Sequence, residues 1–84
     1  MLSKKEHISY WVTTAEEDLA RAQILFDKSD YVFSLFCLCL SIEKMSKALW
    51  VCENANNYPP RIHEVKYILS DTSFVPEWYT KFIY

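Results

Sequence analysis

The sequence predicts an all-α fold, an up-and-down helical bundle of about four helices built on one long antiparallel helical hairpin. Glycine is absent from all 84 residues, which disfavours the tight turns of β-hairpins. Hydrophobic residues make up 51% of the chain and aromatic residues 17%, which argues against disorder. Apolar residues also recur at helical spacing over long stretches. We therefore expect residues 1–84 to form a single helical domain.

The first predicted helix begins near Ser3 and ends near Lys28. Ser3 and Glu6 have the spacing of a capping box, in which each side chain bonds a free backbone N–H at the helix start. Glu17 and Arg21 are one turn apart and are expected to pair on the solvated face. Steps of three and four residues predict one buried apolar stripe, made of Ile8, Trp11, Val12, Ala15, Leu19, Ala22, Leu25 and Phe26.

A second long helix follows after a short connection. In "KSDY", Ser29 and Asp30 are good capping residues, so the two helices are expected to run antiparallel. The stretch "VFSLFCLCL" by itself is typical of a strand, but the helix formers of "SIEKMSKALWVCEN" favour a helix throughout. Its second half is predicted to place on one inner face Ile42, Met45, Leu49 and Cys52.

The first half of this second helix is apolar nearly all round, whereas the second half is amphipathic. We therefore expect the first half to be covered on more than one side, either by further helices or by a second subunit. The charged stretch from Glu43 to Lys47 then marks where one of these covers ends and water begins.

The rest of the chain predicts a loop and two shorter helices. Residues 54–61, "NANNYPPR", combine turn-forming residues with two prolines. Pro76 suits the first turn of a last helix, in which Trp78 and Phe82 lie one turn apart. Between them a short helix is expected, with an inner face of Ile62, Val65, Ile68 and Leu69.

Charge and cysteine content disfavour several classes of function. Nine Lys and Arg against eleven Asp and Glu give a formal charge of -2, so no overall positive field draws the protein to nucleic acid or anionic membranes. The longest apolar stretch is much shorter than a membrane span, and the N-terminus lacks a secretory signal pattern, which favours a cytoplasmic protein. Cys37, Cys39 and Cys52 are expected to be buried, reduced and without a metal.

Several weak motifs occur together in a fixed order. The first helix contributes Trp11, Ala15, Asp18, Leu19 and Ala22, and the second opens with "DYVFSLFCL". "IEKMSKAL" and "PPRIHEVKYIL" follow. In this order and spacing they resemble the HEPN domain (higher eukaryotes and prokaryotes nucleotide-binding), with its Glu-Lys and Lys-Ala signature and its Pro-His-leucine segment. The resemblance covers about residues 8–70 and implies an all-α bundle.

The resemblance also implies a dimerising domain linked to nucleotide or RNA biology, often encoded beside a minimal nucleotidyltransferase as a toxin-antitoxin pair. Many family members are metal-independent ribonucleases, whose motif is an Arg with a His about six positions after it. Here Arg21 and Arg61 are the only arginines and His7 and His63 the only histidines, and neither arginine has a histidine at that interval. The chain therefore resembles a short or truncated member, expected to be a catalytically silent homodimer with a nucleotidyltransferase partner and without a cofactor.

Two alternatives stay open at this point: a ribonuclease toxin and a plain structural or interaction module. For the ribonuclease, His63 supplies a base and Arg61 a cation for the phosphate. The plainer interpretation is that His63 begins a helix and bonds locally while Arg61 is solvated.

Lys44 and Lys47 are the other candidates for nucleotide or RNA binding, through phosphate contacts. Alternatively, Glu43 and Lys47 form a hinge of the bundle or of its dimer, or all three residues lie on an ordinary helix surface. His7 is expected to be a solvated first-turn residue. The aromatic residues that could stack on bases are instead expected in the core: Trp50, Tyr58, Trp78 and Tyr79.

Overall fold

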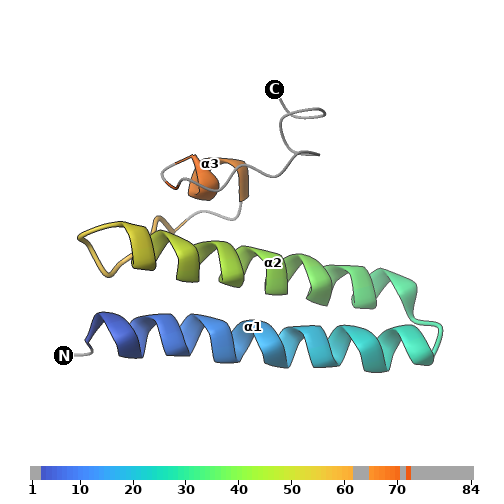
Figure 1. The fold of residues 1–84 in the computed structure, drawn as a ribbon. Helices are drawn as coiled ribbons and strands as arrows, with labels where there is room; N and C mark the ends of the chain where they lie inside the picture. The colour runs from blue at the N-terminus through green and yellow to red at the C-terminus, as the bar shows by residue number, and fades with distance from the viewer. Residues whose placement is uncertain (1–2, 62–64, 71, 73–84) are drawn as a thin grey trace.

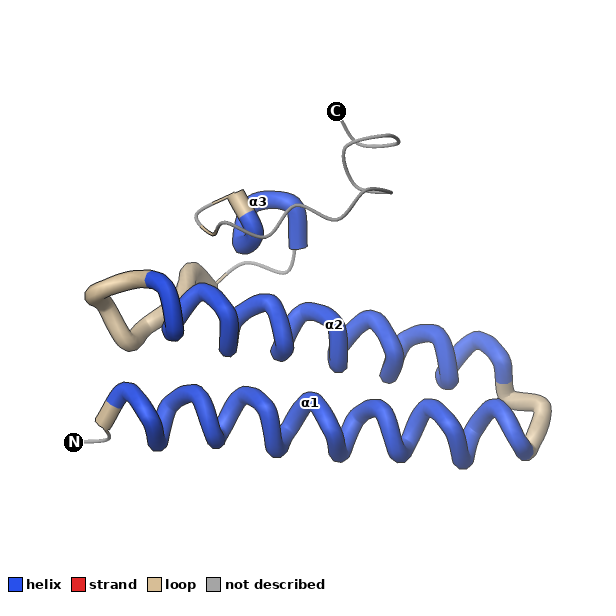
Figure 2. The backbone as a smooth tube through the Cα atoms, viewed as in Figure 1, coloured by secondary structure: helices blue, strands red, loops and turns tan. Residues whose placement is uncertain are grey.

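The structure, a computed structural model, describes residues 3–61, 65–70 and 72. Within these residues it contains three helices and no strand: α1 (Lys4–Asp27), α2 (Tyr31–Glu53) and the short α3 (Val65–Leu69). Helices α1 and α2 run antiparallel side by side, and α3 lies on the side of α2 that faces away from α1 (Figures 1 and 2). The predicted all-α fold and long hairpin are confirmed. The count of about four helices is not, because the last predicted helix lies outside the described residues.

Helix α1 begins with the predicted capping box. The Ser3 hydroxyl accepts a hydrogen bond from the Glu6 backbone N–H at 3.2 Å, and the Glu6 carboxylate accepts one from the Ser3 backbone N–H at 3.3 Å. These two bonds satisfy donors that a helix start leaves without intrahelical partners. The predicted pair on the outer face also forms, with Arg21 3.6 Å from the Glu17 carboxylate.

The connection between the two long helices is three residues long, and its backbone geometry sets the direction of α2. Ser29 adopts a positive φ of 64°. The Ser29 N–H donates to the Phe26 carbonyl and the Asp30 N–H to the Leu25 carbonyl, each at 2.9 Å, which is the Schellman ending of a helix. Asp30 then caps α2 by accepting from the Phe33 N–H. Both predicted capping residues are therefore used, one to end α1 and one to begin α2.

Small side chains form the contact between α1 and α2. Ser34 and Ser41 of α2 donate hydrogen bonds to the carbonyls of Ala22 and Ala15 in α1, at 2.7 and 2.8 Å. All four residues are buried. Because a hydroxyl reaches a backbone carbonyl of the other helix, the two helices lie close together along this row, and large side chains have no room between them.

Large apolar residues meet at the open end of the hairpin instead. Trp50 and Val51 of α2 pack against Ile68 of α3, and Ile8 and Trp11 of α1 adjoin this cluster. Val51 and Ile68 have no exposed surface. The main apolar core therefore lies at the open end of the hairpin and draws side chains from all three helices, with α2 between α1 and α3.

The structure corrects two predictions about which side chains are buried. Leu19 and Phe26 were expected in the inner stripe of α1, but more than half of each side chain is exposed. On α2, the predicted inner-face residues Ile42 and Met45 are nearly half exposed, and Cys52 is exposed. The reason is the small-residue contact, which turns a different face of each helix toward its neighbour.

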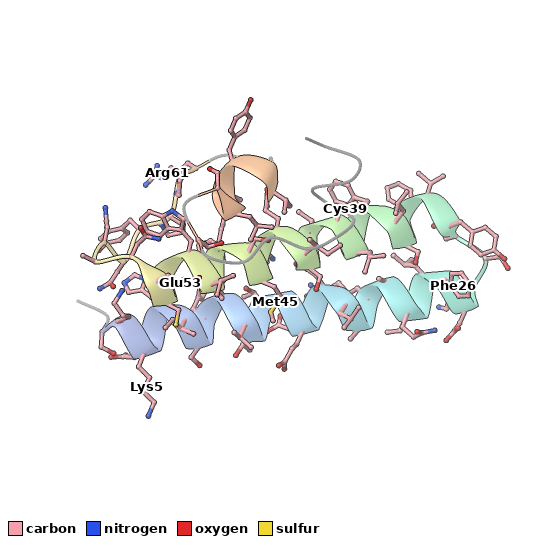
Figure 3. All side chains as sticks on the ribbon, turned by 45° about the horizontal axis from the view of Figure 1, so that its top comes forward. Lys5, Phe26, Cys39, Met45, Glu53 and Arg61 are labelled. Atoms are coloured by element: carbon pink, nitrogen blue, oxygen red, sulfur yellow. The ribbon has the colours of Figure 1, made fainter. Side chains whose placement is uncertain are left out.

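The two halves of α2 are covered to different extents by the described residues. Its apolar first half is open, with Val32 78% and Phe36 60% exposed, so no further described helix covers it, and the other expected cover, a second subunit, stays a prediction. The short helix α3 lies over its second half (Figure 3), where Trp50 packs against Ile68. Glu43, Lys47 and Trp50 are all buried there, so, contrary to the sequence prediction, the charged stretch is not where water begins. Cys37 is half-buried and Cys39 exposed, so the prediction of buried cysteines is wrong.

The left-handed backbone of Ser29 generates the first prediction. A residue with a Cβ atom in this region carries a steric cost that glycine avoids. Ser29→Gly is therefore expected to raise the free energy of unfolding by roughly 0.5 to 1 kcal/mol, measured by urea denaturation. Ser9→Gly, at an exposed helical position of α1, is the matched control and should lower it by about 0.5 kcal/mol. Destabilisation of similar size by both changes would contradict the role of Ser29.

Candidate functional site

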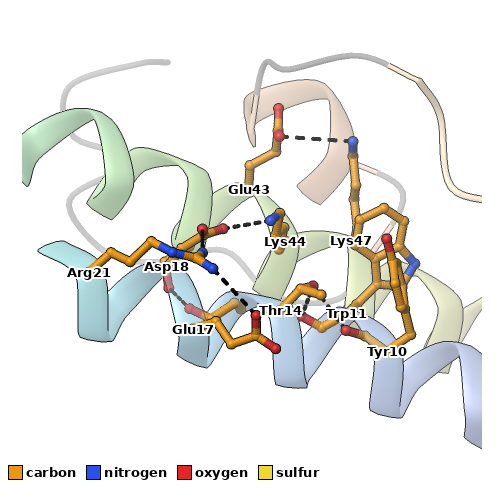
Figure 4. A network of polar contacts seen from close by, with 11 residues as sticks. Tyr10, Trp11, Thr14, Glu17, Asp18, Arg21, Glu43, Lys44 and Lys47 are labelled. Carbon is orange, nitrogen blue, oxygen red and sulfur yellow. Dashed lines mark hydrogen bonds and ion pairs between the residues drawn. The ribbon is translucent and has the colours of Figure 1, made fainter. Parts of the chain in front are cut away.

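A buried carboxylate on α1 organises the polar contacts between the two long helices. Asp18 is only 4% exposed and faces α2. Its Oδ2 atom lies 2.6 Å from the Lys44 ammonium, and its Oδ1 atom accepts a hydrogen bond from Arg21 Nη1 at 2.8 Å (Figure 4). Both oxygens are therefore matched by a cation, which a buried carboxylate requires because it has lost its water.

Lys44, predicted as a phosphate contact, is engaged by this carboxylate. Its side chain is about one-quarter exposed, and its ammonium points to Asp18 on α1. A phosphate that bound Lys44 would compete with a carboxylate already in place. The structure thus gives Lys44 a role in holding α2 against α1.

Lys47 lies one turn further along α2 in a different environment. Its ammonium is 4.0 Å from the Glu43 carboxylate and 5.3 Å above the centre of the Trp11 ring. Both Glu43 and Lys47 are buried, so the alternative of an ordinary solvated helix surface does not hold for this pair. An ion pair of 4.0 Å is longer than a direct hydrogen bond. The aromatic face of Trp11 adds a cation–π contact from the other helix.

A pocket of about 400 Å³ opens beside Lys47, at the open end of the hairpin. Its walls come from the first turns of α1, the late part of α2 and the loop that follows α2. The lining residues are His7, Tyr10, Trp11, Lys47, Asn57, Tyr58, Pro59, Pro60 and Arg61. Cationic and aromatic side chains dominate this set, which contains no Asp or Glu among the described residues.

The loop wall of the pocket is fixed to α1 at its beginning. The Lys4 ammonium donates to the carbonyls of Val51 and Asn54 at 2.5 and 2.6 Å, which ties the end of α2 to the start of α1. Within the loop, the Asn56 side chain accepts from the Tyr58 N–H at 2.9 Å and forms a local turn. The two prolines after Tyr58 restrict the backbone further. The loop therefore holds its side chains against α1.

Two aromatic contacts and one unpaired polar atom characterise the pocket. The rings of His7 and Tyr58 meet edge to face with centroids 5.2 Å apart, and Tyr10 and Trp11 do the same at 5.2 Å. Tyr58 is nevertheless 62% exposed. Asn57 Oδ1 is buried and has no hydrogen-bond partner. A buried acceptor without a donor costs about 1 to 3 kcal/mol, which a suitable ligand would recover.

The structure places the four predicted nucleotide- or RNA-binding residues differently. Lys47 and Arg61 line the same pocket, although they are fourteen positions apart in the printed sequence. Lys44 contacts Asp18 and does not line this pocket, and its predicted phosphate contact stays a prediction. His63 lies outside the described residues, so its pairing with Arg61 stays a prediction.

Sequence reasoning missed three residues of the pocket. His7 was expected to be solvated, but it is half-buried against Tyr58. Tyr58 was expected in the core, yet it is exposed at the pocket. Asn57 was noticed only as part of a turn. The "NNYPPR" loop was recognisable in the sequence, but its contact with the first turns of α1 depends on the hairpin bringing the two ends together.

Neither a metal site nor a membrane span is found in the described part of the chain. No group of three or more His, Cys, Asp or Glu side chains comes together there in a way that would hold a metal ion. Among the described residues, no helix combines the length and the apolar character needed to cross a bilayer.

The fold and these contacts define a class: a small all-α domain in which a long helical hairpin is locked by buried ion pairs and carries a short third helix. The model of the HEPN domain family matches residues 8–79. Because this match covers most of the 84 residues, the chain belongs to the HEPN domain family. Neither a curated protein nor a solved structure gives a significant match. The family indicates a function related to nucleotides or RNA.

The buried ion pair generates the second prediction. Asp18→Asn removes the charge that compensates Lys44 and is expected to lower the free energy of unfolding by about 2 to 3 kcal/mol. Glu17→Gln is the matched control on the same helix, where both members of the pair with Arg21 are more than half exposed. It should change stability by less than about 0.5 kcal/mol.

The double variant Asp18→Leu with Lys44→Met replaces both charges by apolar groups and should recover most of the loss. Chemical denaturation measures all of these differences. Equal effects of Asp18→Asn and Glu17→Gln would show that the buried pair does not hold the hairpin.

Proposed function

We propose that this chain is a catalytically silent HEPN domain of the cytoplasm that forms a homodimer and binds a minimal nucleotidyltransferase in a toxin-antitoxin type of pair. The observation that carries the proposal is the open apolar surface on the first half of α2. This surface is made by Val32, Phe33, Leu35, Phe36 and Leu38, each between 38% and 78% exposed. Monomeric proteins rarely expose neighbouring large apolar side chains in this way.

A second copy of the chain is the partner that we infer for this apolar surface. Symmetric homodimers are the commonest protein assemblies, and apolar residues dominate the centres of their interfaces. A domain of this length also has a small core of its own, so burial of more apolar area on association would add stability. The described residues leave this surface uncovered, which favours the second subunit among the two covers expected from the sequence.

The absence of catalysis is supported by the residues that the family's ribonuclease motif would need. Arg21 already pairs with Asp18 and Glu17. Arg61 lines the pocket, and no histidine follows either arginine at the motif's interval. The nucleotidyltransferase partner is supported by the family resemblance. The ribonuclease alternative has no further observation in its favour within the described residues.

The third prediction tests the dimer. Size-exclusion chromatography with light scattering at micromolar concentration should give twice the chain mass of 10.0 kDa. Phe36→Glu places a charge in the centre of the apolar surface and should shift the protein to the monomer. Ile24→Glu is the matched control, because Ile24 on α1 is similarly exposed. A monomeric wild type, or a dimer that survives Phe36→Glu, would refute this interface.

The fourth prediction tests the partner. Affinity purification of the tagged protein from lysate of its own host should recover a nucleotidyltransferase, and identification of protein and nucleic acid in the eluate would detect it. Expression of the protein alone should not arrest growth if it is catalytically silent. Growth arrest that His63→Ala relieves would instead establish the ribonuclease toxin. Recovery of only its own subunits would favour the remaining alternative, a plain structural or interaction module.

A further inference from the structure

An apolar groove runs along one side of the hairpin, between α1 and α2. Toward the closed end it deepens into a pocket of about 270 Å³, which is lined by Leu19, Ala22, Gln23, Phe26, Ser34 and Leu38. We propose that this groove binds an amphipathic helix of another protein, with the apolar stripe of that helix in the groove and its Lys or Arg side chains along the α1 edge. The site goes beyond the proposed dimer, because much of it belongs to α1 and the dimer surface belongs to α2 alone.

The groove continues from this pocket toward the open end of the hairpin. Leu38, Ile42 and Met45 are spaced by four and three residues, so they lie on one face of α2. On α1, Leu19 and Phe26 are two turns apart and also share a face. The exposed fractions of these five residues lie between 38% and 56%. Phe26 and Met45, both labelled in Figure 3, mark the two ends of the groove.

The length of the groove suits a helix as its occupant. The two hydrogen bonds from the serines of α2 to the alanine carbonyls of α1 fix the alignment of the helices. In this alignment Met45 lies level with Trp11, which is fifteen positions before Phe26. At about 1.5 Å per residue the groove is about 22 Å long, enough for about four turns of a partner helix. Amphipathic helices bind other proteins by placing their apolar face in a groove of this kind.

The α1 edge of the groove is acidic. Glu16 lies two turns before Gln23 and therefore on the same face of α1, and Asp27 accepts a hydrogen bond from Gln23 at 2.9 Å. Both carboxylates belong to exposed residues, and neither forms an ion pair with a described residue. The pocket lining contains no Lys or Arg among the described residues. A partner helix with basic side chains beside its apolar stripe would complement both the groove and this edge.

The same charges distinguish this partner from other occupants. In a two-fold dimer the same surface of each copy meets the other. A second copy in this groove would therefore bring another acidic edge and, from the groove itself, no cation to pair with it. An anionic lipid surface attracts basic segments, so it does not suit an edge that carries Glu16 and Asp27.

Fluorescence anisotropy with two stapled helical peptides of about 15 residues, or about four turns, tests the groove on the full chain. Both peptides carry a stripe of Leu, and they differ only in having Lys or Glu at the flanking positions. The Lys peptide should bind about tenfold more tightly than the Glu peptide. Leu19→Gln should weaken binding of the Lys peptide about tenfold, because an apolar contact is lost. Glu16→Gln should reduce the preference for Lys about threefold.

Matched controls lie on the outer face of α1. Ile24→Gln replaces an apolar side chain of similar exposure to Leu19, and Glu17→Gln removes an exposed charge next to Glu16. Neither should change the affinity for the Lys peptide. Phe36→Glu, which is expected to break the dimer, should also bind this peptide with unchanged affinity. Circular dichroism of each variant verifies that the helical fold is retained.

The outcomes separate the groove from the proposed dimer. A wild type that does not bind the Lys peptide, or that binds both peptides equally, would overturn the inference. Equal affinity in Leu19→Gln and the wild type would place the peptide elsewhere on the protein and would also overturn it. Loss of binding in Phe36→Glu would assign the peptide to the dimer surface instead. Light scattering of the same variants measures the dimer independently, and Leu19→Gln should retain the mass of the wild type.

Discussion

The buried carboxylate of Asp18 is the constraint on which the hairpin depends. It lies on the α1 face that meets α2, and it takes up Lys44 from the other helix and Arg21 from its own. An unmatched charge at this depth would be strongly unfavourable, so the pair forms in only one register of the two helices. The Ser34 and Ser41 bonds to α1 carbonyls agree with the same register. Polar contacts thus set the alignment, and apolar packing follows from it.

The close contact between α1 and α2 determines where the large apolar side chains lie. Because alanine, serine and the ion pair occupy the space between the helices, large apolar side chains are placed elsewhere. At the open end they form a core with α3, around Val51 and Ile68. Toward the closed end no described element covers them, and Val32 and Phe36 remain exposed. One packing mode therefore explains both the core and the proposed interface.

The two ends of the hairpin differ in chemistry as well as in packing. The closed end is apolar and suits another protein surface, whereas the open end gathers Lys47, Arg61 and Tyr58 around a pocket. Lys4 helps to build that pocket, because it joins the end of α2 to the start of α1. The two ends are separated along α2, so the proposed dimer interface and the pocket do not share residues.

The sequence by itself determined the local structure of this protein. Capping at Ser3 and Asp30, the helical periodicity and the turn-rich loop act over a few residues, so the two long helices and their connection could be predicted. Only the tertiary structure decided which faces meet, because Asp18 is buried by a cation from the other helix, and periodicity alone carries no such information. The pocket has the same origin: Tyr58 and His7 are fifty-one positions apart in the chain, and only the antiparallel hairpin brings them together.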